Sequence, residues 1–234
     1  MNYLAIDLEM TGLNVKKDRI LEIGAVHMEN GQPKETFSAL IHPHCDLSDT
    51  IIQLTGITQQ MAGQGEELSD VLPRFLAFAG ELPLLGHNLR YDYSFLMQAC
   101  VNAELPFERS CIDTLKLARR FLPAGQSKKL TDLRQLYSLD TGAVHRAASD
   151  AYAAALVYER LSADFYDTAP EAFAPAPMQM RLKKQQPITI PQKEQLLRLL
   201  PDTSAGEGSV DLDHLTRSEA SRLIERLLRP EHSE

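Results

Sequence analysis

Two acidic residues near the start of the chain have the types and the spacing to hold a divalent cation. Asp7 and Glu9 directly follow the apolar run 3–6, which is typical of a buried strand. Because side chains two apart in a strand point to the same face, the two carboxylates are expected to lie side by side. A divalent cation bound by oxygen ligands would relieve their repulsion. The alternative for this motif alone is a solvated strand end.

Two more acidic residues and a histidine stand in similar positions. Asp92 comes just after a short apolar run and begins a helix-like stretch, and Asp150 lies early in an Ala-rich helical pattern. Taken alone, Asp150 fits equally well as a partner of the helix N-terminus, where negative charge is favoured. His145, five residues earlier at the junction of loop and helix, makes that simpler interpretation less attractive.

The elements that must position these side chains alternate along residues 1–165. The hydrophobic periodicity predicts strands and helices, and Asn30-Gly31 predicts a hairpin between the second and third strands. The order favours an α/β fold in which a mixed sheet, an antiparallel meander plus parallel strands, is flanked by helices. The predicted strands are 3–6, 20–28, 37–41, 82–86 and 111–114, and the predicted helices are 69–79, 91–103, 115–121, 130–137 and 147–161.

The remaining chain has a different composition. Residues 166–187 are rich in Pro and Ala and are interpreted as a linker, and residues 188–230 as a small helical tail domain. Thr189 and Thr216 each begin a capping-box pattern before an amphipathic stretch. About 45 residues are marginal for independent folding, so the tail is expected either to dock on a partner protein or to pack on its own main domain.

Composition narrows the class of protein. The formal net charge of −8 argues against a protein that coats nucleic acid by bulk electrostatics, although not against a local grip on a few nucleotides. No apolar run reaches the roughly 20 residues of a membrane span, and the strand-like start predicts no secretory signal. Three separated cysteines without a C-x-x-C pair make disulfides and zinc unexpected and fit a reducing cytoplasm.

In order and spacing, these motifs resemble those of the DEDDh (DnaQ-like) 3′–5′ exonucleases, which have a ribonuclease H-like fold. The three stretches are Asp7-Leu8-Glu9-Met10-Thr11-Gly12, then Gly86-His87-Asn88 with Asp92, then His145 with Asp150. Arg146 stands where the sister subclass has Tyr, which indicates the His subclass. The resemblance covers residues 1 to about 162. Stretch 113–119 is most similar to the DNA polymerase III epsilon-type proofreading branch.

This resemblance implies a set of site residues. Asp7, Glu9, Asp92 and Asp150 would hold two Mg²⁺ or Mn²⁺ ions, and His145 would be the general base, so that all five count as catalytic. Met10, Thr11 and Asn88 would contact the substrate. Ile57 would press against the terminal base, although Thr55 replaces the family's usual His there, and Ile57 could equally be ordinary core.

The resemblance also implies a reaction. It is metal-dependent 3′–5′ hydrolysis of phosphodiester bonds at the end of single-stranded or frayed DNA, releasing nucleoside monophosphates in proofreading or repair. The first motif also resembles the oligoribonuclease branch, so a 3′–5′ exoribonuclease of short RNA is the alternative. A third hypothesis is a non-catalytic nucleic-acid or polymerase-binding module. Residues 188–230 are a candidate contact for a polymerase or another replication or repair protein.

Overall fold

A computed structural model describes residues 1–139, 146–200 and 210–228. The chain divides into two compact units, one of residues 1–43 and 47–182, and a second of residues 44–46 and the chain from Lys183 onward. Within the described ranges, no helix is both long and apolar enough to cross a membrane.

One six-stranded mixed sheet organises the first unit, in the order β3-β2-β1-β4-β5-β6. Its first three strands form an antiparallel meander, and β4 and β5 run parallel to β1. The turn between β2 and β3 has Asn30 and Gly31 at φ 51° and 78°, which these two residue types tolerate best. The strands are β1 (Asn2–Met10), β2 (Ile20–Glu29), β3 (Gln32–Leu40), β4 (Leu84–Gly86), β5 (Ser110–Asp113) and β6 (Ala176–Pro177).

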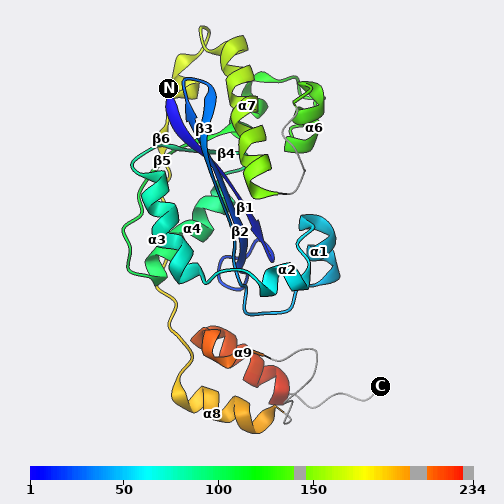
Figure 1. The fold of residues 1–234 in the computed structure, drawn as a ribbon, viewed down its shortest axis with the longest axis vertical. Helices are drawn as coiled ribbons and strands as arrows, with labels where there is room; N and C mark the ends of the chain where they lie inside the picture. Colours follow the sequence, from blue (N-terminus) through cyan, green and yellow to red (C-terminus); the bar gives the residue numbers. More distant parts are fainter. Residues whose placement is uncertain (140–145, 201–209, 229–234) are drawn as a thin grey trace. The chain divides into compact units, whose positions relative to one another are not determined.

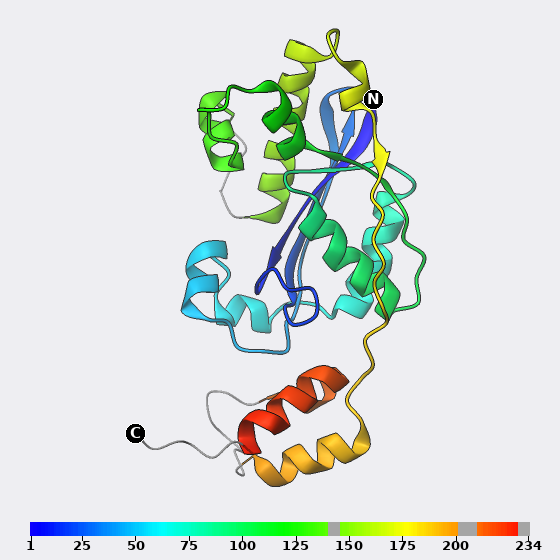
Figure 2. The same ribbon diagram turned by 180° about the vertical axis from the view of Figure 1, so that it is seen from behind.

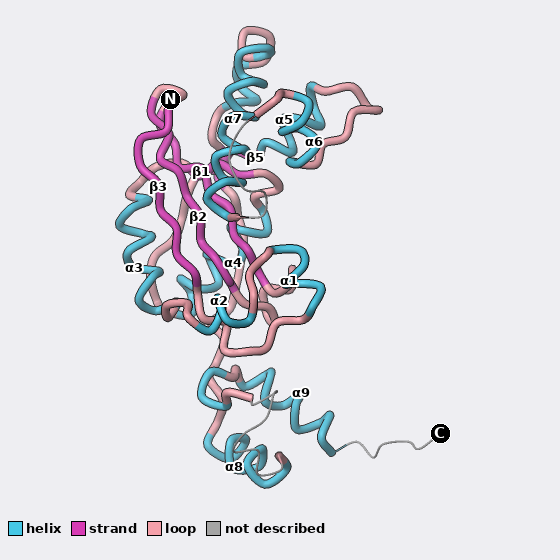
Figure 3. Tube along the Cα trace, turned by 45° about the vertical axis from the view of Figure 1, so that its right-hand side comes forward, coloured by secondary structure: helices cyan, strands magenta, loops and turns pink. Residues whose placement is uncertain are grey.

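Helices cover both faces of this sheet, which confirms the predicted ribonuclease H-like α/β class (Figure 1, Figure 3). Figure 1 shows α3 and α4 on one side and α6 and α7 on the other. Alternation along β1 explains the two cores, because Leu4 and Ile6 belong to the cluster on the α3 and α4 side, whereas Tyr3 and Ala5 belong to the cluster under α7. The helices are α3 (Leu68–Ala79), α4 (Arg90–Asn102), α5 (Thr114–Phe121), α6 (Leu130–Leu136) and α7 (Ala147–Phe165).

Two short helices, α1 (Asp49–Thr55) and α2 (Gln59–Gly63), were not apparent from the hydrophobic periodicity. Their N-caps are local, since the side chains of Ser48 and Thr58 accept backbone N–H groups three residues later. Together they enclose a small third core around Leu21.

Part of the stretch interpreted as a linker packs on the first unit instead. Residues 170–173 form a 3-10 helix, η1 (Pro170–Phe173), and β6 pairs antiparallel with β5. The physical reason is Phe173, which is 1% exposed and stacks on Phe121. The aromatic anchor outweighs the Pro- and Ala-rich composition around it.

The second unit contains a pair of helices, α8 (Ile190–Leu199) and α9 (Arg217–Leu228), with a 3-10 turn η2 (Leu212–His214). Both capping boxes exist. Thr189 and Gln192 cap α8, and the Thr216 side chain accepts the Glu219 N–H while the Glu219 carboxylate accepts the Thr216 N–H. Leu196 and Ala220 are the buried residues of the two helices.

Candidate metal centre

The central strand β1 carries the first acidic pair to its carboxyl end. Because Tyr3, Ala5, Asp7 and Glu9 alternate with the leucine face, the two carboxylates are on the side of the sheet that α7 covers. The pairing of β1 with β2 changes register between Glu9 and Met10, a bulge that ends the regular ladder beside the pair.

Two helix N-termini bring in the other two carboxylates. Asp150, in the first turn of α7, offers a carboxylate oxygen that lies within 4.8 Å of oxygens from Asp7 and Glu9. Asp92, in the first turn of α4, accepts the Leu8 N–H at 3.2 Å, so the β1 backbone itself holds it. We call these four residues the carboxylate cluster. The structure brings together all four predicted ligands.

The proximity of the carboxylates changes their protonation. Burial, then the charges of Asp92, Glu9 and Asp150, raise the pKa of Asp7 well above its ordinary range. Burial and neighbouring carboxylates raise the pKa of Glu9 to about 8, and burial raises the pKa of Asp92 to about 7. Clustered acids with raised pKa values in one crevice are typical of functional sites.

The fit of α7 against the sheet depends on a glycine. Gly24 pairs with Asp7 in the β1–β2 ladder, and a Cβ atom placed on it would lie 2.0 Å from the backbone nitrogen of Ala148. Only a residue without a side chain allows α7 to approach so closely. This approach brings Asp150 into contact distance of the β1 carboxylates.

Glu22 fastens the start of α7 to β2. It faces Glu9 across the ladder, is 1% exposed, and accepts the guanidinium of Arg146 at 2.8 Å and the N–H of Ala147 at 3.2 Å. The double contact from Arg146 is a strong, directional ion pair. Glu22 lies in the stretch covered by the family resemblance, but its ion pair with Arg146 could not be predicted from the sequence.

A buried arginine beside the cluster was missed by the sequence interpretation. Arg134 on α6 donates to Asp150 at 2.8 Å, and both side chains are nearly inaccessible to solvent. Its guanidinium supplies positive charge next to four acids. The only sequence signal is an Arg directly after the buried Leu133 in a helical pattern, which is also common on solvated helix faces.

The loop before α4 is held by side chains from neighbouring elements. Asn88 adopts a left-handed conformation (φ 64°), and its N–H donates to Asp113, the N-cap of α5. His87 bridges the hydroxyl of Thr114 and the carbonyl of Lys128, and burial lowers its pKa. His87 therefore holds in place the loop that carries Asn88.

The predicted substrate residues lie in different environments. Thr11 and Met10 are partly buried at the end of β1, and the Thr11 hydroxyl accepts the Arg19 N–H. Ile57 is fully buried in the small core with Leu21, so contact with a base would require the α1–α2 region to open. His145 lies outside the described residues, between the two ranges that flank it.

The donor set fits a divalent cation. Three carboxylates within one ligand sphere, with Asp92 adding its charge, offer oxygen atoms only. Hard oxygen ligands suit Mg²⁺ or Mn²⁺, and the raised pKa values indicate anionic crowding that a cation would relieve. Asp7, Glu9, Asp92 and Asp150 are the residues that would hold it.

Comparison with known proteins gives a consistent result. The RNase_T profile, described as exonuclease, matches residues 4–158. DNA polymerase III subunit epsilon of Aquifex aeolicus is 32% identical over 160 residues, covering 68% of this chain and 79% of that protein. A PolC-type DNA polymerase III of Caldanaerobacter subterraneus is 33% identical over 159 residues, but the chain spans only 11% of its length.

Solved structures show the same fold. Exonuclease X in complex with 5′ overhanging duplex DNA superposes with a TM-score of 0.59 at 25% identity, covering 74% of this chain and 99% of that one. Exonuclease I superposes with a TM-score of 0.62 at 20% identity over 42% of its own chain. With its carboxylate cluster at the end of β1 and a family match over most of the first unit, the chain belongs to the DEDDh (DnaQ-like) branch of the RNase_T exonuclease family.

Proposed function

We propose that the chain removes nucleoside monophosphates from the 3′ end of single-stranded or frayed DNA. The packing of Asp7, Glu9 and Asp150 within one ligand sphere, with Asp92 anchored beside them, carries this proposal. The relative named DNA polymerase III subunit epsilon supports DNA as the substrate. The fold likeness to exonuclease X, solved with 5′ overhanging duplex DNA, supports action at an exposed end.

Each residue has a proposed part in hydrolysis. Two Mg²⁺ or Mn²⁺ ions would supply activation of water and stabilisation of the leaving oxygen. The four carboxylates, Asp7, Glu9, Asp92 and Asp150, would hold the ions. His145 would accept the proton of the attacking water, because imidazole titrates near neutral pH. The backbone at Met10 and Thr11, with Asn88, would orient the terminal nucleotide.

End-labelled oligonucleotides test direction and substrate together. Single strands of DNA and RNA with matched sequence are incubated with the protein and Mg²⁺ or Mn²⁺. We expect 5′-labelled DNA to shorten in single-nucleotide steps and 3′-labelled DNA to release a labelled mononucleotide first, with EDTA stopping both. Faster hydrolysis of RNA would favour the exoribonuclease alternative. Binding without hydrolysis would favour the non-catalytic module and overturn the proposal.

The second unit is proposed to contact a replicative polymerase or another replication or repair protein in the cytoplasm. Supporting observations are the DNA polymerase III relative and two exposed apolar residues on α8, Ile190 at 76% and Leu197 at 62% exposure. The three cysteines are free, which suits a reducing compartment.

The full chain and its Ile190→Ser/Leu197→Ser variant test this contact. Co-elution with the purified replicative polymerase of the same cell is measured by gel filtration. We expect the variant to lose co-elution and to keep wild-type hydrolysis of free oligonucleotides. Equal co-elution of both proteins would contradict the proposal.

A further inference from the structure

A groove of about 1130 Å³ lies in the first unit, and part of its lining comes from the first turn of α4, which also carries Asp92. Asn88, Arg90 and Tyr91 line it from the loop and first turn of α4, the same turn that holds Asp92 on its buried side. Leu13, which closely follows Thr11 and Gly12, lines it as well. The groove therefore begins within one helical turn of a proposed metal ligand.

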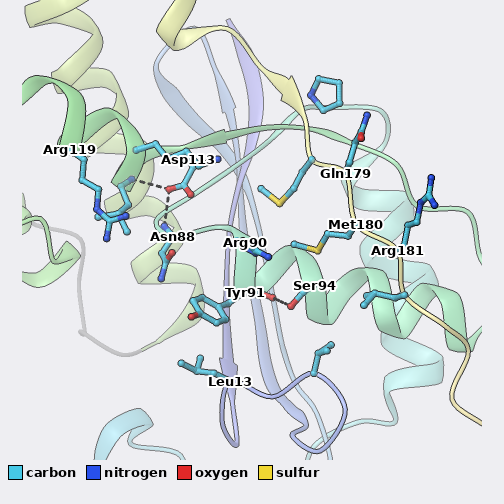
Figure 4. Close-up of a pocket in the computed structure, with 16 residues that line it drawn as sticks. Leu13, Asn88, Arg90, Tyr91, Ser94, Asp113, Arg119, Gln179, Met180 and Arg181 are labelled. Atoms are coloured by element: carbon cyan, nitrogen blue, oxygen red, sulfur yellow. Dashed lines mark hydrogen bonds between the residues drawn. The ribbon is translucent and has the colours of Figure 1, made fainter.

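The charge of this groove is opposite to that of the chain as a whole. Four cationic side chains line it, all of them exposed, and among the described residues none of the four forms an ion pair. In Figure 4 Arg119 lies on one side, Arg90 in the middle and Arg181 on the other. The four are Arg90, Lys116, Arg119 and Arg181; we call their surface the cationic groove.

A single acid lines the groove among the residues that the structure describes, and backbone groups hold it. The carboxylate of Asp113 accepts the N–H groups of Asn88 and Leu115, both at 3.0 Å. Because these contacts point the carboxylate into the loop that it caps, it does not pair with the four cations. The groove is left with an uncompensated positive charge.

One wall of the groove comes from the segment that follows β6. Met178 and Met180 are partly buried against the main core, whereas Gln179 and Arg181 between and after them are exposed. This alternation is that of an extended chain with one face on the protein. Figure 2 shows the segment running along α4. It lies beyond residue 158, where the family match ends.

Apolar and aromatic side chains line the groove together with the cations. Tyr91 is 38% exposed and Leu13 63%, and both line the groove together with Met180. A positively charged groove that also offers an aromatic ring is the usual means of holding single-stranded nucleic acid, with phosphates on the cations and bases on the rings. An acidic peptide would pair with the cations but would not account for the exposed Tyr91 and Leu13 in the same groove.

We propose that the cationic groove binds the single strand upstream of the terminal nucleotide, with the segment 178–182 as its outer wall. This rests on the proposed exonuclease function and extends it to the part of the substrate that is not cut. Arg119 and Arg181 contact phosphates at separate points, and Tyr91 stacks on a base.

The full chain carrying Arg119→Gln/Arg181→Gln is compared with a matched control, Lys34→Gln/Arg160→Gln, which removes two exposed cations outside the groove. Two substrates distinguish an effect on the groove from an effect on the metal centre. One is a DNA single strand of about 20 nucleotides, long enough to fill a binding groove. The other is the p-nitrophenyl ester of thymidine monophosphate, which holds one nucleotide only.

We expect kcat/KM on the oligonucleotide to fall about tenfold in the groove variant, because two phosphate contacts are lost. On the ester, kcat/KM should equal that of wild type, and the control should match wild type on both. An unchanged rate on the oligonucleotide would overturn the groove while leaving the exonuclease function intact. Loss on both substrates would also overturn it, since the cations would then serve the metal centre.

A binding measurement tests the groove proposal independently of the proposed hydrolytic function. Fluorescence anisotropy of labelled oligo(dT) is measured in an Asp7→Asn background across a salt series. The groove variant should reduce the slope of log K against log salt by about 1.4, which is 0.7 for each of two phosphates. Tyr91→Leu should weaken binding at least fivefold and Tyr91→Phe should restore it. Displacement of oligo(dT) by polyglutamate as effectively as by unlabelled oligo(dT) would favour a peptide and overturn the proposal.

Discussion

The carboxylate cluster and the cationic groove are neighbours that use charge in opposite ways. The four acids are crowded within one ligand sphere or fixed by backbone and arginine, and the pKa values of Asp7, Glu9 and Asp92 are raised. The four cations of the groove are exposed and unpaired within the described chain. The charges proposed to hold an ion are thus fixed in a crowded cluster at a cost in stability, whereas the charges proposed to meet a long polymer stay accessible to solvent.

The largest expected effect is on the carboxylate side. Asp7→Asn removes a proposed metal ligand with little change in volume, and hydrolysis should fall on the order of a thousandfold. Because the substitution also removes a crowded acid, the metal-free protein should not lose stability in urea. Rates on labelled DNA and unfolding curves in EDTA measure the two outcomes. Wild-type activity in this variant would contradict the assigned metal centre.

Removal of the buried cation beside the cluster should come next. Arg134→Leu leaves Asp150 without its arginine, and loss of one member of a buried ion pair costs about 3–5 kcal/mol. Urea unfolding in EDTA measures the change in free energy of unfolding. Added Mg²⁺ should recover part of it, because the ion then compensates Asp150. Arg74→Leu, which breaks an exposed pair with Glu66, is the control and should change stability much less, because water screens an exposed pair.

The glycine contact under α7 gives a smaller effect. Gly24→Ala forces α7 away from the sheet, which should cost about 1–3 kcal/mol as overpacking does. The affinity for Mn²⁺ should fall as well, since Asp150 moves from Asp7. Calorimetric titration and urea unfolding follow both. Gly125→Ala has open space around it and serves as the control. A stable variant with unchanged Mn²⁺ affinity would show that the close approach is not needed.

A pH series in EDTA tests the crowding of the acids directly. Glu9 and Asp92 have pKa values of about 8 and about 7 in the folded protein, above the ordinary values near 4 of the unfolded chain. Between pH 4 and 8 the folded state therefore binds more protons than the unfolded state. The stability that comes from these extra bound protons is present below pH 4 and is lost as the pH rises to 8. Tm should fall across the window in EDTA and fall less with Mg²⁺. A flat difference between the two series would contradict the coupling.

The smallest effect is expected from one cation of the groove. Lys116→Gln should change kcat/KM on a long strand about threefold or less and reduce the salt slope by about 0.7. Stability should be unchanged, because Lys116 is exposed. An effect as large as that of Asp7→Asn would remove the contrast between the two regions.

Local patterns predicted the elements that position the site better than they predicted its contacts. Spacing of two placed Asp7 and Glu9 on one face, and alternation along β2 predicted the strand opposite them. Arg134 escaped because a pairing between α6 and α7 depends on packing rather than on spacing. The β6 segment escaped because Pro and Ala resemble a linker, while the deciding residue, Phe173, acts through distant aromatic partners.

The contacts of Glu22 with Arg146 and Ala147 affect which parts of the molecule unfold together. It ties the first turn of α7 to the same ladder that carries Asp7 and Glu9. Because these contacts link the start of α7 to the β1–β2 ladder, the three segments should unfold cooperatively. The amides of β1, β2 and the start of α7 should then exchange with deuterium as one unit. Two parts of the chain more than a hundred residues apart would then share a single opening event.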